Sequence, residues 1–349
     1  MWLEPDDITM DTFSILDEKG RLHGEEPHIE AHQIIEMYKW MLLIRLFDER
    51  AVKMQRQGRL GTYAPVCGQE AAQVGSAYAL RKQDWIFPSY REIGAALVHG
   101  MPLSQLFLYP MGHLAGASPP EGVNVFSQQI IIAAQSLHAM GSAWASKYLE
   151  KDEVSVAYVG DGATSQGDFH EALNFAAVQR LPIIFFVQNN QWAISVPVSK
   201  QTASRTLAQK ALACGISGIR VDGNDLLAVY RVMQEAIRRA RQGKPVLVEA
   251  VTYRLGAHTT ADDPTRYRQQ SELENWQAKD PIRRMKSYLM HKKLWNEELE
   301  EKEVRRLEQE IAESFKQAEE TPRSRLQEAF DHVYETLPPS LKEQKDSLG

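Results

Sequence analysis

The alternation of apolar and polar stretches is clearest between residues 154 and 194. Val154–Val159 and Ile183–Val187 are short, apolar, β-branched runs, which are typical of buried strands. Between them, residues 165–180 place apolar side chains at three- and four-residue steps, which predicts a helix that ends before Pro182. The segment is therefore a strand–helix–strand unit, whose two strands run parallel and end at the same edge of a sheet.

Similar patterns on both sides extend this unit into an α/β fold. Strands are expected over residues 85–88, 218–223 and 245–253. Helices are expected over residues 32–57, in a separate alanine-rich segment that ends at Leu80, and from residues 129–135 through 139–145. Further helices are expected over 226–241 with Asp225 as N-cap, after Asp280-Pro281, and over 297–319. Because strands and helices alternate, we predict a mostly parallel sheet with helices on both faces.

The two ends of the chain and two internal segments have no such pattern. Residues 1–30 are polar and irregular, and we expect an extended arm that docks on a partner or stays mobile. Residues 31–349 would then form a single α/β domain with helices at its C-terminal end. Residues 109–129 and 256–271 are rich in glycine, proline or charge and are expected to be loops.

Composition narrows the class of protein. The chain has 349 residues, of which 43% are apolar, and a net charge of −6, which argues against nucleic-acid binding. Its two cysteines, Cys67 and Cys214, are too few for a disulfide framework. The acidic N-terminus is unlike a signal peptide, and no apolar run is long enough for a membrane span. These features predict a cytoplasmic protein that binds neither nucleic acid nor membrane.

Polar residues follow both strands of the central unit. Gly160-Asp161-Gly162 comes after the first strand, and Asn190 comes after the second. Ligands of open α/β sheets bind at this edge, carboxylate and amide oxygens suit Mg²⁺, and a helix N-terminus attracts anions. The edge therefore predicts a site for Mg²⁺ and a pyrophosphate. Gly-Asp-Gly by itself is a common turn, and the glycines do not match the G-x-G-x-x-G fingerprint of dinucleotide-binding folds.

Gly160-Asp161-Gly162, followed after residues 163–188 by Asn189-Asn190, resembles the thiamin diphosphate motif. Together with Thr164–Phe169, the match resembles the alpha subunit of the decarboxylating component of 2-oxo acid dehydrogenase complexes, and is most similar to the bacterial pyruvate dehydrogenase type found in Bacillus. The resemblance runs from about Phe13 to Gln344. It implies the thiamin diphosphate-binding fold, with thiamin diphosphate and Mg²⁺ as cofactors.

The resemblance also implies roles for particular residues. Mg²⁺ would be held by the side chains of Asp161 and Asn190 and by the carbonyl of Trp192. His258 would act in catalysis and would also reach the cofactor diphosphate. The other expected cofactor contacts are Tyr90, Arg91, Ile130, Ile132, Gln135, Gly162 and Ala163. From the residues alone, Arg91 could equally be a surface arginine in an ion pair, and His258 a structural histidine.

Thiamin chemistry needs a carboxylate to act on the aminopyrimidine ring, and no second domain supplies one here. Glu70 and Glu92 are candidates by charge alone and are better explained as surface or structural carboxylates. In the family this glutamate lies on a beta subunit, so the resemblance implies an α2β2 heterotetramer that docks on a lipoyl-bearing acyltransferase core. The implied reaction is oxidative decarboxylation of a 2-oxo acid, with pyruvate favoured, and reductive acylation of the lipoyl group.

The chain departs from the family pattern at four positions. Thr62 replaces a phenylalanine at the expected substrate pocket, Gln191-Trp192 replaces Arg-Phe, and Ala115 replaces the second histidine of a two-histidine loop. His113 in that loop could compensate and is a second candidate for the substrate pocket. Branched-chain 2-oxo acids or acetoin remain possible substrates, and a regulatory subunit that binds the cofactor without turnover remains a further alternative.

Overall fold

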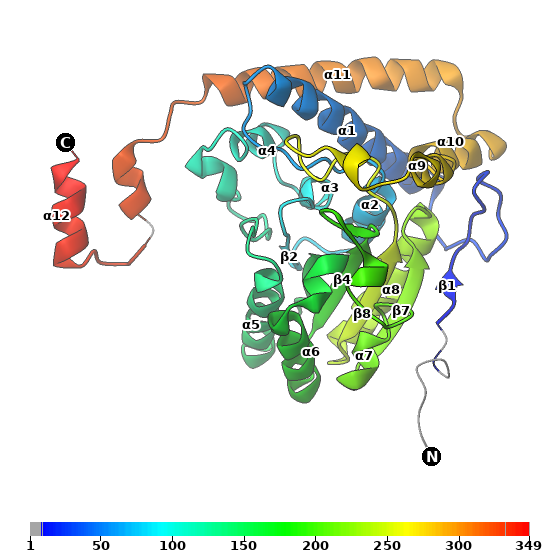
Figure 1. Ribbon diagram of the computed structural model, residues 1–349, viewed down its shortest axis with the longest axis horizontal. Helices are drawn as coiled ribbons and strands as arrows, with labels where there is room; N and C mark the ends of the chain where they lie inside the picture. Colours follow the sequence, from blue (N-terminus) through cyan, green and yellow to red (C-terminus); the bar gives the residue numbers. More distant parts are fainter. Residues whose placement is uncertain (1–7, 9, 332, 349) are drawn as a thin grey trace.

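A six-stranded parallel sheet forms the centre of the protein in the computed structural model, which describes residues 8, 10–331 and 333–348. Every neighbouring pair in the sheet is parallel. Across the sheet, the order is β1 (Thr12–Phe13), β7 (Ser217–Asp222), β8 (Val246–Val251), β4 (Ile183–Asn189), β3 (Ser155–Gly160) and β2 (Trp85–Phe87). This architecture confirms the α/β class with a parallel sheet (Figure 1).

Side chains that alternate along the strands bury both faces of the sheet. Val156 and Tyr158 of β3 pack in one apolar core with α1 (Ala31–Arg56), α2 (Glu70–Tyr78) and α8 (Leu226–Arg241). Ala157 and Val159 of the same strand pack in a second core with α5 (Ala134–Tyr148), α6 (Gly167–Gln179) and α7 (Lys210–Ala213). Strands buried on both faces explain the unbroken apolar runs in the sequence.

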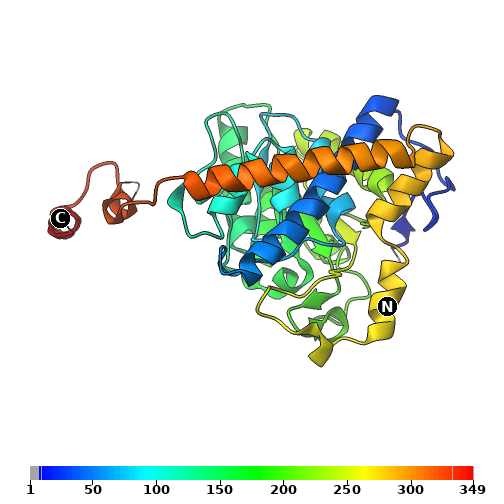
Figure 2. The ribbon, with the colours of Figure 1, turned by 90° about the horizontal axis from the view of Figure 1, so that it is seen from above.

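The other described helices complete the fold. They are α3 (Ile93–Val98), α4 (Leu103–Leu108), α9 (Gln270–Gln277), α10 (Pro281–His291), α11 (Glu297–Glu320) and α12 (Pro339–Ser347). Helix α11 crosses over α1 on the outside of the domain (Figure 2), whereas α12 lies apart from the body at the end of an extended connection (Figure 1). Among the helices that the structure describes, none combines the length and apolar composition needed to span a membrane.

Two segments differ from the expectations. Residues 12–16, expected in an extended arm that docks on a partner or stays mobile, pack on the domain of this chain instead: β1 pairs with β7, and Ile15 and Leu16 are buried. The carboxylate of Asp225, which caps α8, also accepts the backbone N–H groups of both buried residues. Residues 1–7 and 9 lie outside the described residues. Helix α5 begins at Ala134, because Ala133 adopts φ of 71°, so residues 129–133 precede the helix.

The register of the strands places the acidic motif around Asp161 beside the amide motif around Asn190. Gly160 at the end of β3 is paired with Gln188 on β4. Asp161 follows Gly160 directly and starts a short 3₁₀ turn (Asp161–Ser165), and Asn190 follows the last residue of β4. Both side chains therefore stand at the carboxyl edge of the sheet, where ligands of parallel α/β proteins bind.

Candidate functional site

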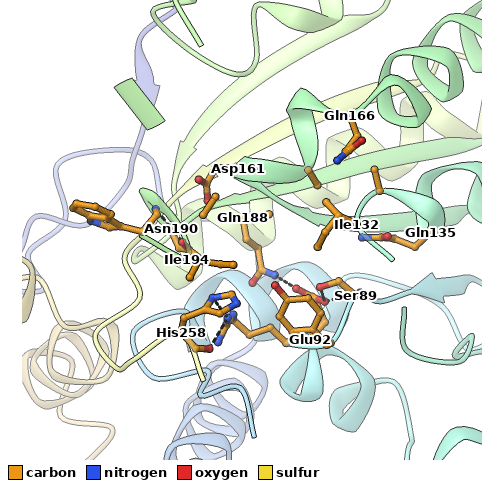
Figure 3. A pocket seen from close by; sticks show the side chains of 18 of the residues that line it. Ser89, Glu92, Ile132, Gln135, Asp161, Gln166, Gln188, Asn190, Ile194 and His258 are labelled. Atoms are coloured by element: carbon orange, nitrogen blue, oxygen red, sulfur yellow. Dashed lines mark hydrogen bonds between the residues drawn. The ribbon is translucent and has the colours of Figure 1, made fainter. Parts of the chain in front are cut away.

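A cavity of about 260 Å³ opens at this edge and is lined by residues from six separate stretches of the chain (Figure 3). Ten of the residues expected from the sequence to contact the cofactor or metal line it: Tyr90, Arg91, Ile132, Gln135, Asp161, Gly162, Ala163, Asn190, Trp192 and His258. They come from the turn after β2, the start of α5, the ends of β3 and β4, and the loop after β8. The fold therefore gathers groups that are up to 168 positions apart in the sequence into one concave site.

Asp161 is the buried acidic group of the cavity. Its side chain is 2% exposed, and its Oδ2 accepts a hydrogen bond from Nε2 of Gln201 at 2.9 Å. Within the described part of the chain, no other residue donates to Oδ1. Burial raises the pKa of Asp161 to about 6, against smaller lowering effects from Gln201, Arg254 and Arg91. A buried carboxylate with a single side-chain donor and a raised pKa is a group that a cation would stabilise.

Asn190 and Trp192 supply neutral oxygens beside this carboxylate. Oδ1 of Asn190 accepts the Trp192 backbone N–H at 3.3 Å, and its Nδ2 donates to Oε1 of Gln69 at the same distance. The Trp192 carbonyl accepts a hydrogen bond from Nη1 of Arg254 at 3.2 Å, which leaves its second lone pair available. Among the described residues, no group of three or more His, Cys, Asp or Glu side chains is arranged so that it could hold a metal ion. Any metal here would be bound by one carboxylate with amide and carbonyl oxygens, a hard oxygen set that fits Mg²⁺.

Two buried guanidinium groups stand near this acidic end. Arg91 is 5% exposed and donates to the carbonyls of Pro65 at 2.6 Å and His258 at 3.0 Å. Arg254 is 0% exposed and donates to the carbonyls of Trp192 and Ile194 and to the hydroxyl of Tyr267. Neither has a carboxylate partner among the described residues. Of the two, Arg91 lines the cavity, and a buried cation without a carboxylate partner makes this part of the cavity an anion-seeking site.

His258 lies between the two arginines. Its Nδ1 is 3.2 Å from Nη2 of Arg91 and 3.0 Å from Nη1 of Arg254, and its ring meets the Tyr90 ring edge-on with centroids 6.0 Å apart. Burial, followed by the charges of Arg91 and Arg254, lowers the pKa of His258 to about 4. The imidazole is therefore neutral at physiological pH.

The opposite end of the cavity is mostly apolar. Ile132 lines the cavity there, and Gln135 donates Nε2 to the Tyr158 carbonyl at 2.8 Å while its Oε1 is buried without a partner. Ile130 lies outside this cavity but lines a second one, of about 460 Å³, which shares Tyr90, Ile132 and His258 with the first. Thr62 also lines the second cavity, so the structure places it beside the site.

Other expected or suspected residues lie elsewhere. His113 contacts neither cavity: its Nε2 donates to the Pro322 carbonyl at 2.6 Å and its Nδ1 accepts the Ala115 N–H, so the ring fastens the 113–117 turn to the segment after α11. The structure thus does not bring His113 to the substrate pocket. The Gln191 side chain folds back onto Asn189. Glu70 is buried and paired with Arg45, and is therefore structural rather than a surface carboxylate.

Several residues of the site could not be recognised from the sequence. Gln69 and Gln188 line the cavity, and Gln188 donates Nε2 to Glu92 at 2.5 Å. Glu92, which the sequence offered only as a carboxylate candidate by charge, is 2% exposed and also accepts hydrogen bonds from the backbone and hydroxyl of Ser89, so it forms a hydrogen-bonded part of the cavity wall. Gln201 and Arg254 act on the site through Asp161 and His258. The only sequence signal for Arg254 is its place just after a strand, at the same sheet edge.

Comparison with known proteins points to one family. The family model described as "Dehydrogenase E1 component" matches residues 38–327. The "Pyruvate dehydrogenase E1 component subunit alpha" of Staphylococcus aureus is 48% identical to this chain over 334 residues, which cover 95% of this chain and 90% of the relative. The protein of the same name from Staphylococcus epidermidis is 47% identical over the same length and shares of the two chains. The matched region contains every residue of the cavity described above.

Proposed function

Because this chain belongs to the dehydrogenase E1 component family, we propose that it is the alpha subunit of a thiamin diphosphate-dependent 2-oxo acid dehydrogenase that acts on pyruvate. The family membership confirms the resemblance seen in the sequence and implies dependence on thiamin diphosphate. The substrate is inferred from the name of the relatives, which cover almost the whole chain at nearly half identity.

The observation that supports this proposal best is the pairing of charges in the cavity. Asp161 and Asn190 offer oxygens for Mg²⁺, and the buried guanidinium of Arg91, which lines the cavity, has no carboxylate partner among the described residues. A diphosphate bound with Mg²⁺ would satisfy both: the metal would neutralise the buried carboxylate, and the phosphate oxygens would receive charge-assisted hydrogen bonds from arginine.

In this proposal, Asp161, Asn190 and the Trp192 carbonyl hold Mg²⁺. The 3₁₀ turn that contains Gly162 and Ala163 brings backbone groups against the diphosphate. A Cβ at Gly162 would lie 2.6 Å from Cβ of Ala193, so only glycine lets this turn approach the 192–194 segment so closely. Tyr90 and His258 form the wall between the diphosphate end and the second cavity.

The aminopyrimidine end would be formed by Ile130, Ile132 and Gln135. When bound, thiamin diphosphate supplies the carbon nucleophile and the electron sink for loss of carbon dioxide from a 2-oxo acid. The chain's own contribution is to orient the cofactor, to exclude water with apolar walls and to offer the neutral His258 ring at the point where the two cavities meet. The second cavity, which Thr62 lines, would receive the substrate.

A beta subunit would complete the site. Only two carboxylates line the first cavity within the described part of the chain, and both have other tasks: Asp161 faces the metal end, and Glu92 is bound by Ser89 and Gln188. Beside the cavity, Ile130, Ile131 and Ile132 are 60%, 71% and 40% exposed. Consecutive exposed isoleucines at a cavity mouth are typical of a protein interface. We therefore infer an α2β2 assembly whose beta chain supplies the missing carboxylate, and which transfers the acyl group to a lipoyl-bearing core.

Reconstitution with the beta subunit tests the proposal. The two chains would be combined with thiamin diphosphate and Mg²⁺, and decarboxylation of pyruvate and of 3-methyl-2-oxobutanoate would be followed with an artificial electron acceptor. We expect turnover only when both chains are present, with pyruvate the better substrate. A faster rate with the branched substrate would reassign the substrate class. An assembly that binds its cofactor and turns over neither substrate would favour acetoin or a regulatory subunit.

A further inference from the structure

We propose that Arg254 is a positioning residue that acts through His258: together with Arg91, it holds the imidazole as the tautomer with its proton on Nε2, so that the ring presents a hydrogen-bond donor to the cavity. Neither the sequence motifs nor the comparisons give Arg254 a role. The argument depends on contacts within this chain alone and is independent of which cofactor or substrate occupies the cavity.

Arg254 ties together three parts of the site. Its Nη1 contacts Nδ1 of His258 at 3.0 Å and the Trp192 carbonyl at 3.2 Å. Its Nη2 donates to the Ile194 carbonyl at 2.9 Å and to the Tyr267 hydroxyl at 3.1 Å. The guanidinium of Arg254 is fully buried, and the backbone carbonyl of Arg254 accepts a hydrogen bond from Nη1 of Arg268. A side chain held by four directed hydrogen bonds has little freedom to rotate away from the histidine.

The identity of the donors decides which nitrogen of His258 carries the proton. Guanidinium nitrogens can only donate hydrogen bonds, and both Arg91 and Arg254 approach Nδ1. Nδ1 must therefore be the acceptor, and in a neutral imidazole the proton must then be on Nε2. The other tautomer and the doubly protonated ring would each place an N–H against two cations at about 3 Å.

The other groups around His258 do not change this assignment. Oδ2 of Asp262 accepts the backbone N–H of His258 at 2.8 Å and the Tyr267 hydroxyl, so the carboxylate serves the loop backbone and not the ring nitrogens. Tyr90 approaches the ring edge-on, which gives Nδ1 no competing acceptor. No hydrogen bond in the described part of the chain engages Nε2, which leaves Nε2–H free for a ligand.

This arrangement is the reverse of a histidine prepared to act as a base. In the usual base, a carboxylate or carbonyl accepts from Nδ1–H and leaves Nε2 as the free acceptor. Here two donors occupy Nδ1, so Nε2 is the nitrogen left to donate on a ring that lines the cavity. His258 would therefore stabilise an oxyanion or carboxylate by donating a hydrogen bond, and Arg254 would keep it in that form.

Histidine hydrogen–deuterium exchange with mass spectrometry, carried out on the full chain without cofactor, measures the pKa of His258 directly. We expect a value well below 6.5 in the unmodified protein, and a rise of at least about one unit in Arg254→Gln, because one of two flanking cations is removed. Arg254→Lys should keep the low value. Arg268→Gln is the matched control, because it removes an arginine from the same loop without touching the ring, and it should leave His258 unchanged.

Nitrogen-15 NMR of histidine-labelled protein, assigned with His258→Gln, reports the tautomer itself. The expected signature is a non-protonated Nδ1 and a protonated Nε2 near pH 7, with a mixture of tautomers in Arg254→Gln. A proton on Nδ1, or a His258 pKa of about 6.5 or higher in the unmodified chain, would overturn the proposal. An equal shift of the His258 pKa in Arg254→Gln and in Arg268→Gln would also contradict the proposal, because Arg254 would then serve only to hold the loop. Because both measurements use the free chain, a failed cofactor assignment would leave them unaffected.

Discussion

Nε2 of Gln201 donates a hydrogen bond to Oδ2 of Asp161 at 2.9 Å, and the same nitrogen donates to the Val196 carbonyl at 3.1 Å. Gln201 thereby fixes the rotation of a buried carboxylate that we assign to Mg²⁺. Residues that orient a metal ligand typically change metal affinity by about 10–100-fold when removed. We expect Gln201→Leu to weaken Mg²⁺-dependent cofactor binding by about 10-fold. Titration of Mg²⁺ at fixed thiamin diphosphate measures this, and the exposed Gln242→Leu should bind as the unmodified protein does.

Asp161→Asn should have opposite effects on stability and binding. Burial raises the folded-state pKa of Asp161 to about 6, so its contribution to stability is full below the unfolded value and is lost as pH rises through 6. Replacing the carboxylate with an amide removes that loss. In EDTA, we expect the variant to be more stable than the unmodified protein by about 3 kcal/mol at pH 8, and the difference to vanish near pH 4.

Denaturant unfolding at the two pH values checks this expectation, and a calorimetric titration in Mg²⁺ should show that the same variant has lost cofactor binding. A variant that is less stable at pH 8 would mean that the carboxylate is stabilised by partners within the chain, contrary to the assignment of Asp161 to a cation.

Gly162 lies where two backbone segments approach each other closely. A Cβ there would meet Cβ of Ala193 at 2.6 Å, whereas a Cβ at Gly160, two residues earlier, would meet nothing within 4 Å. Gly162→Ala must therefore push the 3₁₀ turn and the 192–194 segment apart. We expect a loss of about 1–3 kcal/mol in unfolding free energy together with weaker cofactor binding. Gly160→Ala should cost little unfolding free energy, and equal losses of unfolding free energy in both variants would show that backbone flexibility, not the close approach, matters here.

Asp225 fastens the N-terminal segment to the domain. Its Oδ2 accepts the N–H groups of Ile15 and Leu16 at 2.6 and 2.7 Å, and its Oδ1 caps α8. Asp225→Ala leaves buried N–H groups unpaired, and we expect a loss of about 2–4 kcal/mol in unfolding free energy. Amide hydrogen exchange at Ile15 and Leu16 should become faster in this variant. The exposed Asp11→Ala, in the same segment, should leave the protection of both amides intact.

The sequence was sufficient for the features that depend on local pattern. Strands that are buried on both faces produce apolar runs, and the residues that follow parallel strands share one edge of the sheet. The sequence alone therefore predicts that Asp161 and Asn190 lie close together. Asp225 was also recognisable as a helix cap, because N-caps have a local signature.

Features that depend on long-range contacts could not be predicted. The second carboxylate oxygen of Asp225 accepts hydrogen bonds from residues more than 200 positions earlier, which no local pattern reveals. The sequence therefore predicts residues 12–16 in an extended arm that docks on a partner or stays mobile. Gln201 reaches Asp161 across 40 positions, and Arg254 reaches His258 only because the loop folds back after β8. The start of α5 was misplaced because the left-handed backbone at Ala133 has no signature in an alanine.

The central claim, that this sheet edge binds a diphosphate together with Mg²⁺, is tested most directly by comparing two ligands that differ only in the diphosphate. Thiamin diphosphate and thiamin would each be titrated by calorimetry into the assembly of this chain with its beta subunit, in Mg²⁺ and in EDTA, and into the Asn190→Ala assembly. We expect tight binding only of thiamin diphosphate and only with Mg²⁺, with thiamin or the variant weaker by at least about 100-fold, the scale of two lost charge-assisted hydrogen bonds. Equal binding of both ligands, or binding unaffected by EDTA and by Asn190→Ala, would contradict the assignment.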